Sequence, residues 1–163
     1  MSTITMPERE IPVVGHYDVV VAGGGPGGIP AAVAAARAGA KTLLIERYGY
    51  LGGMATAGLI TVILGTRASG TDEPMIGGIA EELCREMTSL GGAPDYDEAV
   101  RRGGIAFDPE AFKLVSDAIV LGSNVDVRLH SWVADTIVED GMVSALVLES
   151  KSGRQAVTGR VFI

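Results

Sequence analysis

The stretch YDVVVAGGGPGGIPAAVAAARAGAKTLLIE, from Tyr17 to Glu46, decides the fold of this chain. It passes through a hydrophobic strand, a glycine-rich turn, an alanine-rich helix, a second strand and a final carboxylate. A G-x-G-x-x-G turn alone arises often by chance, whereas one followed by a helix, a strand and an acid at this distance is far more specific. The stretch therefore predicts a βαβ unit that grips the diphosphate and ribose of a dinucleotide.

Each glycine of the turn has its own predicted role. Gly23 permits the tight turn out of the strand, Gly25 lets the backbone approach a pyrophosphate, and Gly28 lets the helix pack close to the strand. The helix is predicted to begin near Pro26, which a first turn tolerates because the N–H that proline lacks has no partner there. Free N–H groups at this helix end attract phosphate, and Gly27 completes the predicted pyrophosphate site.

The acid that closes the second predicted strand, residues 42–45, is Glu46. A carboxylate at this point can accept hydrogen bonds from both ribose hydroxyls, and it repels a 2′-phosphate, which argues against NADP. The alternative is a glycine-rich turn in a βαβ unit that binds no ligand. The sequence indicates no catalytic acid or base, because neither His16 nor His130 has suitable partners nearby in the sequence.

Hydrophobic periodicity predicts the remaining elements. Helices are expected over 76–88 and 109–121, the second capped by Asp108, and a loop over 90–104. Turn residues such as Asp140-Gly141 separate four short strands, which predicts an antiparallel β-meander. Trp132 and Cys84 are expected to be buried, the latter as an inert thiol. The four strands span residues 125–130, 132–139, 142–150 and 155–163.

Composition limits the classes of protein that this chain can represent. With 163 residues, 47% hydrophobic and 20% charged, it fits one globular domain, predicted over 17–163 after a loosely ordered lead-in at 1–16. The net charge of −7 disfavours nucleic acid as a partner. The single cysteine allows neither an intramolecular disulfide nor a cysteine metal cluster, so no metal site is predicted. Neither a membrane span nor a secretory signal is apparent, which favours a cytoplasmic protein.

The segment after Glu46, RYGYLGGMATAGLI, carries a family resemblance. Together with the glycine turn, it resembles the FAD-dependent oxidoreductases whose FAD domain is of the glutathione-reductase or fumarate-reductase type. The LGGMAT motif and the later FDPE at 107–110 resemble a bacterial group within that family, with the flavin subunit of heterodisulfide reductases among its relatives. The resemblance implies an α/β, Rossmann-like FAD/NAD(P)-binding domain, with a parallel sheet and an antiparallel β-meander, and FAD as the cofactor.

The resemblance also extends the predicted site beyond the turn and the acid. A second glycine pair, Gly52-Gly53, is expected to lie against the cofactor. Met54, Ala55 and Thr56 after it are expected to pass toward the ribityl chain or the flavin. The backbone at Val133 is expected to meet the adenine. The predicted cofactor-binding residues are Gly23, Gly25, Pro26, Gly27, Gly28, Glu46, Arg47, Gly52, Gly53, Met54, Ala55, Thr56 and Val133.

Three functions remain open at this point. The first is the FAD-binding portion of an FAD-dependent oxidoreductase that acts on a small-molecule substrate or a redox partner. The second is a non-catalytic flavin-binding subunit that passes electrons to an iron–sulfur partner, and the third is an NAD-binding dehydrogenase domain. In the resembled family an acidic, glycine-containing segment follows the last strand, so we expect this chain to be an incomplete domain, with a natural short flavin-binding module as the alternative.

Overall fold

The βαβ unit predicted from the sequence forms the centre of the structure. The computed structural model describes residues 2–5, 7–71 and 73–163. Strands β1 (Val13–Ala22) and β2 (Thr42–Ile45) lie parallel, and helix α1 (Gly28–Arg37) connects them. All four residues of β2 are buried, as expected for a strand with neighbours on both sides and packing on both faces.

Six strands form one sheet in the order β5-β2-β1-β8-β7-β6. The four new strands are β5 (Asp126–Arg128), β6 (Trp132–Glu139), β7 (Met142–Ser150) and β8 (Gly153–Phe162). Strands β5, β2, β1 and β8 run parallel, whereas β8, β7 and β6 form an antiparallel meander. This arrangement confirms the predicted Rossmann-like fold with a parallel sheet and a meander.

The meander has three strands, and the prediction of four was wrong. The first predicted strand, 125–130, contains β5, which pairs in parallel with β2. Helix α4 (Pro109–Gly122) precedes β5 and supplies the crossover that a parallel neighbour requires. The alternating sequence before Trp132 indicates a strand but not its partner, since pairing is decided by the preceding crossover rather than by local pattern.

The predicted lead-in also ends earlier than expected. Strand β1 begins at Val13, and Val13 lies opposite Ala156 of β8. The backbone N–H of Ala156 donates to the carbonyl oxygen of Pro12 at 2.9 Å. Residues 13–16 therefore belong to the sheet, because β8 returns beside them as a partner that the N-terminal sequence alone does not reveal.

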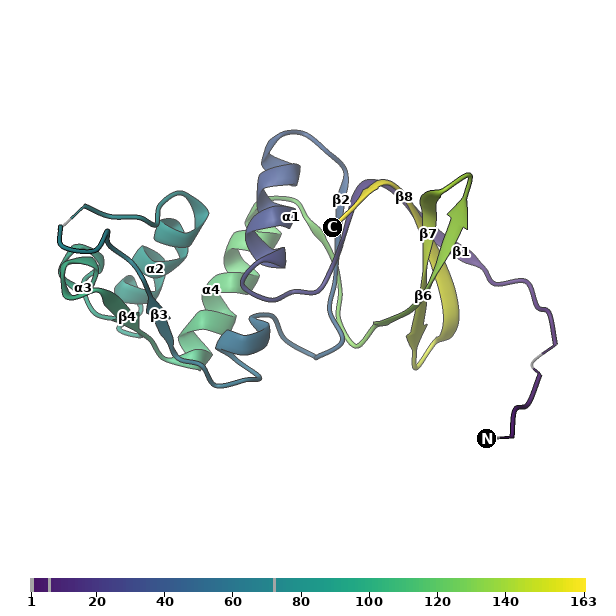
Figure 1. Cartoon of the computed structure of the whole chain (residues 1–163), viewed down its shortest axis with the longest axis horizontal. Coiled ribbons are helices and arrows are strands. Elements are labelled where there is room, and N and C mark those ends of the chain that lie inside the picture. The colour runs from purple at the N-terminus through teal and green to yellow at the C-terminus, as the bar shows by residue number, and fades with distance from the viewer. Residues whose placement is uncertain (1, 6, 72) are drawn as a thin grey trace.

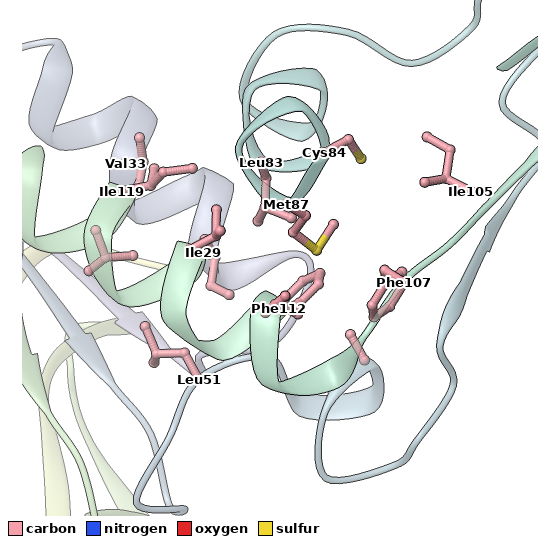
Figure 2. Close-up of a cluster of buried hydrophobic side chains, with 14 of the residues drawn as sticks. Ile29, Val33, Leu51, Leu83, Cys84, Met87, Ile105, Phe107, Phe112 and Ile119 are labelled. Atoms are coloured by element: carbon pink, nitrogen blue, oxygen red, sulfur yellow. The ribbon is translucent and has the colours of Figure 1, made fainter. Parts of the chain in front are cut away.

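Two separate hydrophobic cores lie on opposite faces of the parallel strands (Figure 1). On one face α1, α4 and α2 (Ile79–Ser89) pack together, with Ile29, Met87 and Phe112 among the buried contacts (Figure 2). On the other face, the meander residues Leu146, Leu148 and Val157 pack against buried side chains of β1 and β2. The meander thus both extends the sheet and covers its second face.

A small unit at the far side of α2 corrects the predicted loop at 90–104. It contains helix α3 (Tyr96–Arg102) and a two-stranded sheet of β3 (Val62–Leu64) and β4 (Gly104–Ala106). Asp95 caps α3 by accepting a hydrogen bond from the backbone N–H of Glu98 at 2.9 Å. The spacing Asp-x-x-Glu before an apolar pair is a helix-start signal that the loop prediction overlooked.

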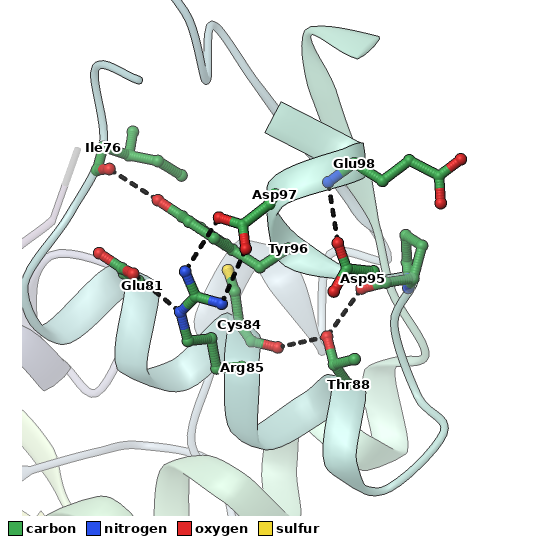
Figure 3. A network of polar contacts seen from close by, with 10 residues as sticks. Ile76, Glu81, Cys84, Arg85, Thr88, Asp95, Tyr96, Asp97 and Glu98 are labelled. Carbon is green, nitrogen blue, oxygen red and sulfur yellow. Dashed lines mark hydrogen bonds and ion pairs between the residues drawn. The ribbon is translucent and has the colours of Figure 1, made fainter. Parts of the chain in front are cut away.

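Side-chain contacts fasten α3 onto α2 (Figure 3). The Arg85 guanidinium bridges Glu81 at 2.8 Å and Asp97 at 3.0 Å, and it lies over the Tyr96 ring. The Tyr96 hydroxyl donates to the carbonyl oxygen of Ile76 at 2.8 Å. These polar contacts surround a buried apolar contact, because Tyr96, Ala99 and Val100 of α3 belong to the same hydrophobic cluster as Leu83, Cys84 and Met87 of α2.

Three further predictions are settled by the structure. Asp108 caps α4 by accepting from the N–H of Glu110 at 2.7 Å, as predicted. Cys84 is fully buried, as predicted, and burial raises the pKa of its thiol to about 11. Trp132 was predicted to lie in the core, but it is 54% exposed, because it lies on β6, the exposed edge strand of the sheet.

Candidate functional site: the glycine turn and Glu46

The glycine turn closes through one contact that only glycine permits. Gly23 has φ +121°, and its N–H donates to the Ile45 carbonyl oxygen at 2.8 Å, so the turn leaves β1 against the end of β2. A Cβ atom at Gly28 would lie 1.8 Å from the carbonyl oxygen of Gly23. The first residue of α1 therefore packs directly on the turn, which sets the helix N-terminus beside it.

The second glycine pair lies against this turn. Gly52 donates its N–H to the carbonyl oxygen of Gly24 at 2.7 Å, and both Gly52 and Gly53 have positive φ. A Cβ atom at Gly53 would lie 2.9 Å from the Cα atom of Gly25. Two glycine segments that are distant in the sequence thus meet backbone to backbone. The short 3₁₀ helix η1 (Gly53–Ala55) continues the chain from this contact.

Glu46 is positioned by two backbone amides. One carboxylate oxygen accepts from the N–H of Gly24 at 2.8 Å, and the other accepts from the N–H of Tyr48 at 2.9 Å. The side chain is only 5% exposed. A carboxylate oxygen has lone pairs for more than one donor, so each can still accept from a hydroxyl group. The acid predicted at the end of β2 is therefore fixed in orientation beside the glycine turn.

Two hollows meet at this carboxylate. One, of about 280 Å³, lies at the ends of β1 and β2 and is lined by residues that include Gly23, Ser131 and Val133. The other, of about 360 Å³, lies between the two glycine segments and is lined by residues that include Gly25 and Met54. Glu46 and Arg47 line both hollows. The arrangement forms a crevice that runs from Val133, past Glu46, to the glycine contact.

Aromatic rings surround the Arg47 guanidinium at the middle of the crevice. Its central carbon lies 4.6 Å from the Tyr48 ring centroid and 5.2 Å from that of Trp132. Tyr48 and Trp132 each line one of the two hollows, although neither was predicted as a site residue. A tryptophan at the first residue of a strand, directly before the expected adenine contact Val133, was the signal that could have indicated Trp132.

The predicted residues divide into those that line the crevice and those that shape it. Thr56 and Ala55 are buried, and the Thr56 hydroxyl donates to the Leu51 carbonyl oxygen at 2.8 Å. A Cβ atom at Gly52 would lie 2.4 Å from the Thr56 side chain, so these residues support the second glycine pair from behind. The residues that line a hollow are Gly23, Gly25, Pro26, Glu46, Arg47, Gly53, Met54 and Val133.

Comparison with known proteins decides the family. The family model described as FAD dependent oxidoreductase matches residues 18–163. The chain belongs to the FAD-dependent oxidoreductase family. Digeranylgeranylglycerophospholipid reductase 1 of Methanopyrus kandleri is 31% identical over 157 residues, which cover 91% of this chain and 39% of that protein.

Solved structures share the fold at lower identity. THI4 of Thermovibrio ammonificans superposes with a TM-score of 0.60 at 18% identity, covering 90% of this chain and 56% of that one. The myxobacterial chondrochloren halogenase CndH, a variant of FAD-dependent halogenases, gives a TM-score of 0.62 at 20% identity over 91% of this chain and 37% of that one. The chain spans about two-fifths of the Methanopyrus kandleri reductase and about a third to a half of these structures' chains.

The crevice fits the cofactor that defines the FAD-dependent oxidoreductase family. A Cβ atom at Gly23 or Gly27 would meet no protein atom within 4 Å, and one at Gly25 would meet only the Gly53 Cα atom at 3.9 Å. Backbone at these glycines is thus open to a close approach, at the N-terminus of a helix whose dipole favours an anion. Beside it, the Glu46 carboxylate supplies acceptors suited to sugar hydroxyls. These are the groups that a diphosphate and an adjoining ribose require.

Other kinds of centre find little support in the residues that the structure describes. Among them, no cluster of three or more histidine, cysteine or acidic side chains could hold a metal ion. No helix within the described ranges is long and apolar enough to cross a bilayer. The buried thiol of Cys84, with its raised pKa, lies in the helical core and not in the crevice.

Proposed function

We propose that this chain is the FAD-binding portion of an FAD-dependent oxidoreductase that transfers a hydride or electrons to or from a small-molecule substrate or a redox partner. The observation that carries the proposal is the crevice in which two glycine segments touch and the fixed carboxylate of Glu46 belongs to a residue that lines both hollows. Bound FAD supplies the redox chemistry, while the protein binds and orients it. A cytoplasmic location is part of the proposal.

The diphosphate is assigned to the contact between the two glycine segments. Gly23, Gly25, Gly27 and Gly28 offer backbone without side chains at the N-terminus of α1. Gly25 and Pro26 line the 360 Å³ hollow. The approach is close because Gly25 and Gly53 have no Cβ atoms to hold the ligand away. The helix end carries partial positive charge, which offsets part of the diphosphate charge.

The two ends of the cofactor are assigned to the two hollows. Glu46 accepts the ribose hydroxyls, and the 280 Å³ hollow takes the adenine against the backbone of Val133, with the Arg47 guanidinium and the Trp132 ring at its rim. The 360 Å³ hollow directs the ribityl chain past Met54. Ala55 and Thr56, being buried, act by holding Gly52 and Gly53 in position.

Reconstitution separates this proposal from its alternatives. The 163-residue chain is incubated with FAD, with NAD⁺ or with NADP⁺, desalted, and scanned for absorbance while bound nucleotide is quantified. We expect FAD to be retained in preference to both nicotinamide dinucleotides. Retention of NAD⁺ without FAD would indicate a dehydrogenase domain instead, and binding of no dinucleotide would contradict the proposed site.

Iron analysis tests the electron-relay alternative. A flavin-binding subunit that serves an iron–sulfur partner should co-purify with a partner protein that contains iron and acid-labile sulfide. The described part of this chain holds no cluster of metal ligands, so iron in the isolated chain is not expected. Stoichiometric iron in a purified complex would favour the relay, whereas flavin reduction by a small molecule in iron-free protein would favour the oxidoreductase.

A further inference from the structure

A polar hollow, distinct from the two hollows of the cofactor crevice, lies beside the end of β5. It has a volume of about 480 Å³ and lies between the end of β5 and the turn that joins β7 to β8. We infer that this hollow binds a phosphoryl group of a small anionic ligand. Its lining residues are Val127, Arg128, Leu129, His130, Ser131, Ser150, Lys151, Ser152 and Gln155.

The charge of the lining supports an anion. Arg128 and Lys151 are cationic, whereas no carboxylate lines the hollow. Arg128 donates to the neutral amide oxygen of Gln155 at 3.1 Å, and no ion pair between described residues involves Arg128 or Lys151. Two uncompensated cations in one hollow are unexpected in a chain with a net charge of −7, and they attract an anion.

A second hollow of similar size contains an arginine whose charge is neutralised by an ion pair. The groove of about 430 Å³ between α1, α2 and α4 also contains an arginine, Arg37. There both terminal nitrogens bind the Glu82 carboxylate at 2.7 Å, and the Nε–H donates to Ser123 at 3.1 Å. Arg37 is thus satisfied internally, whereas Arg128 keeps N–H groups available for a ligand.

The available donors suit a tetrahedral oxyanion. Arg128, Lys151, Ser152 and Gln155 all line this hollow, and each carries a side-chain group that can donate a hydrogen bond. Arginine binds phosphate oxygens through a rigid fork, and lysine contributes a mobile point charge. Ser131 is the one residue that this hollow shares with the 280 Å³ hollow of the crevice. A ligand here would therefore sit beside the adenine end of the cofactor without overlapping the glycine turn.

The chain contains two histidines, so their NMR signals can report ligand binding at the hollow against an internal reference. His130 lines the hollow, whereas His16 lies on β1 and binds the Thr158 hydroxyl at 2.6 Å. Inorganic pyrophosphate is titrated into FAD-saturated protein at constant ionic strength, and the two imidazole signals are followed by proton NMR. We expect the His130 signals to move with saturation while the His16 signals stay. Equal shifts of both, or no shift, would overturn the inference.

Substitutions identify the charges responsible. Arg128→Gln and Lys151→Gln should each raise the apparent Kd for pyrophosphate about tenfold, the effect of losing one charge-assisted contact. The control is Arg160→Gln, an arginine on β8 whose side chain is 83% exposed and which should change the Kd less than about twofold. Lys151 lies on an exposed turn, so its variant should fold even if Arg128→Gln does not. An unchanged Kd in Lys151→Gln would contradict the assignment.

A soluble ligand and a lipid headgroup present the same phosphoryl chemistry, so a second arm distinguishes them. Vesicles of phosphatidylcholine with and without phosphatidic acid are sedimented with the protein. If the protein sediments only with vesicles that contain phosphatidic acid, and only when Lys151 is present, the ligand is a lipid headgroup. If the protein does not sediment but binds pyrophosphate saturably, the ligand is soluble. FAD retention is measured independently. A negative pyrophosphate result would therefore leave the FAD assignment intact, and a negative FAD result would leave the anion-site inference intact.

Discussion

The cofactor crevice and the α2–α3 unit are held together by different kinds of contact. In the crevice, backbone atoms make the decisive contacts, as when Gly28 packs on the carbonyl oxygen of Gly23 and two amides hold Glu46. In the α2–α3 unit, partly exposed side chains such as Arg85 and Asp97 join two helices. Backbone contacts fix positions closely, whereas surface ion pairs contribute about 1 kcal/mol or less.

This difference teaches which substitutions should matter for the cofactor. Changes in the crevice should impair FAD binding because the contacts leave no freedom to adjust. Changes in the α2–α3 unit should alter the free energy of unfolding modestly and leave the FAD affinity intact. The predictions that follow test that separation, beginning with the largest expected effect.

Gly28→Ala should abolish FAD retention and destabilise the fold. The new Cβ atom would lie 1.8 Å from the Gly23 carbonyl oxygen, so α1 or the turn must move. Overpacking of this kind costs about 1–3 kcal/mol, and the displacement falls on the diphosphate site. Thermal unfolding and FAD binding measure the two effects. Gly122→Ala, at the end of α4 with no atom within 4 Å, is the control and should retain FAD.

Glu46→Gln should weaken FAD binding about 10- to 100-fold. The Gln side chain presents an NH₂ group to one of the two backbone N–H donors, so one donor loses its partner and the ribose loses a charged acceptor. Loss of hydrogen bonds to a charged group costs about 1.5–3 kcal/mol. Titration with FAD gives the Kd. Glu139→Gln, at the exposed end of β6, is the control and should leave the Kd for FAD unchanged. Equal FAD affinities for the two variants would contradict the role given to Glu46.

Cys84 should make the protein less stable in alkali. Burial raises the pKa of its thiol from about 9 to about 11, so the folded state favours the protonated form. The resulting stabilisation is fully present below pH 9 and is lost as the pH rises toward 11. Chemical denaturation across this range should show a steeper decline than in Cys84→Ala. A parallel decline in the two proteins would show that the thiol is not desolvated as described.

Asp95→Ala should have the smallest effect of the four changes. It removes the cap of α3, which costs about 1 kcal/mol of unfolding free energy, and it should leave the Kd for FAD unchanged. Denaturant unfolding and FAD titration measure the two quantities. Glu86→Ala, at an exposed position within α2, serves as the control for charge removal. A clear loss of FAD affinity in Asp95→Ala would show that the two regions are coupled.

The sequence predicted the βαβ unit well because its signals are local. Glycines at fixed spacing, an alanine-rich helix and a carboxylate at the end of β2 each reflect a contact within a short stretch. The α4 cap at Asp108 and the three meander strands were recovered for the same reason. The family resemblance predicted that Gly52 and Gly53 lie against the cofactor, but the contact of Gly53 with Gly25 was not predicted, since no spacing rule connects the two segments.

The parts that the sequence did not predict depend on distant partners or on short elements. The pairing of β5 with β2 depends on the α4 crossover, and the early start of β1 depends on β8. Helix α3 has only seven residues, so periodicity is weak and the Asp95 cap was the better signal. The exposure of Trp132 reflects the place of β6 at the edge of the sheet, which the local sequence does not reveal.

A crystal structure of the chain with FAD would test the central claim most directly. We predict that the diphosphate lies at the contact between Gly25 and Gly53, that Glu46 accepts both ribose hydroxyls, and that the adenine occupies the hollow beside Val133. A diphosphate bound away from the N-terminus of α1, with the Glu46 carboxylate contacting only the amides of Gly24 and Tyr48, would contradict the account.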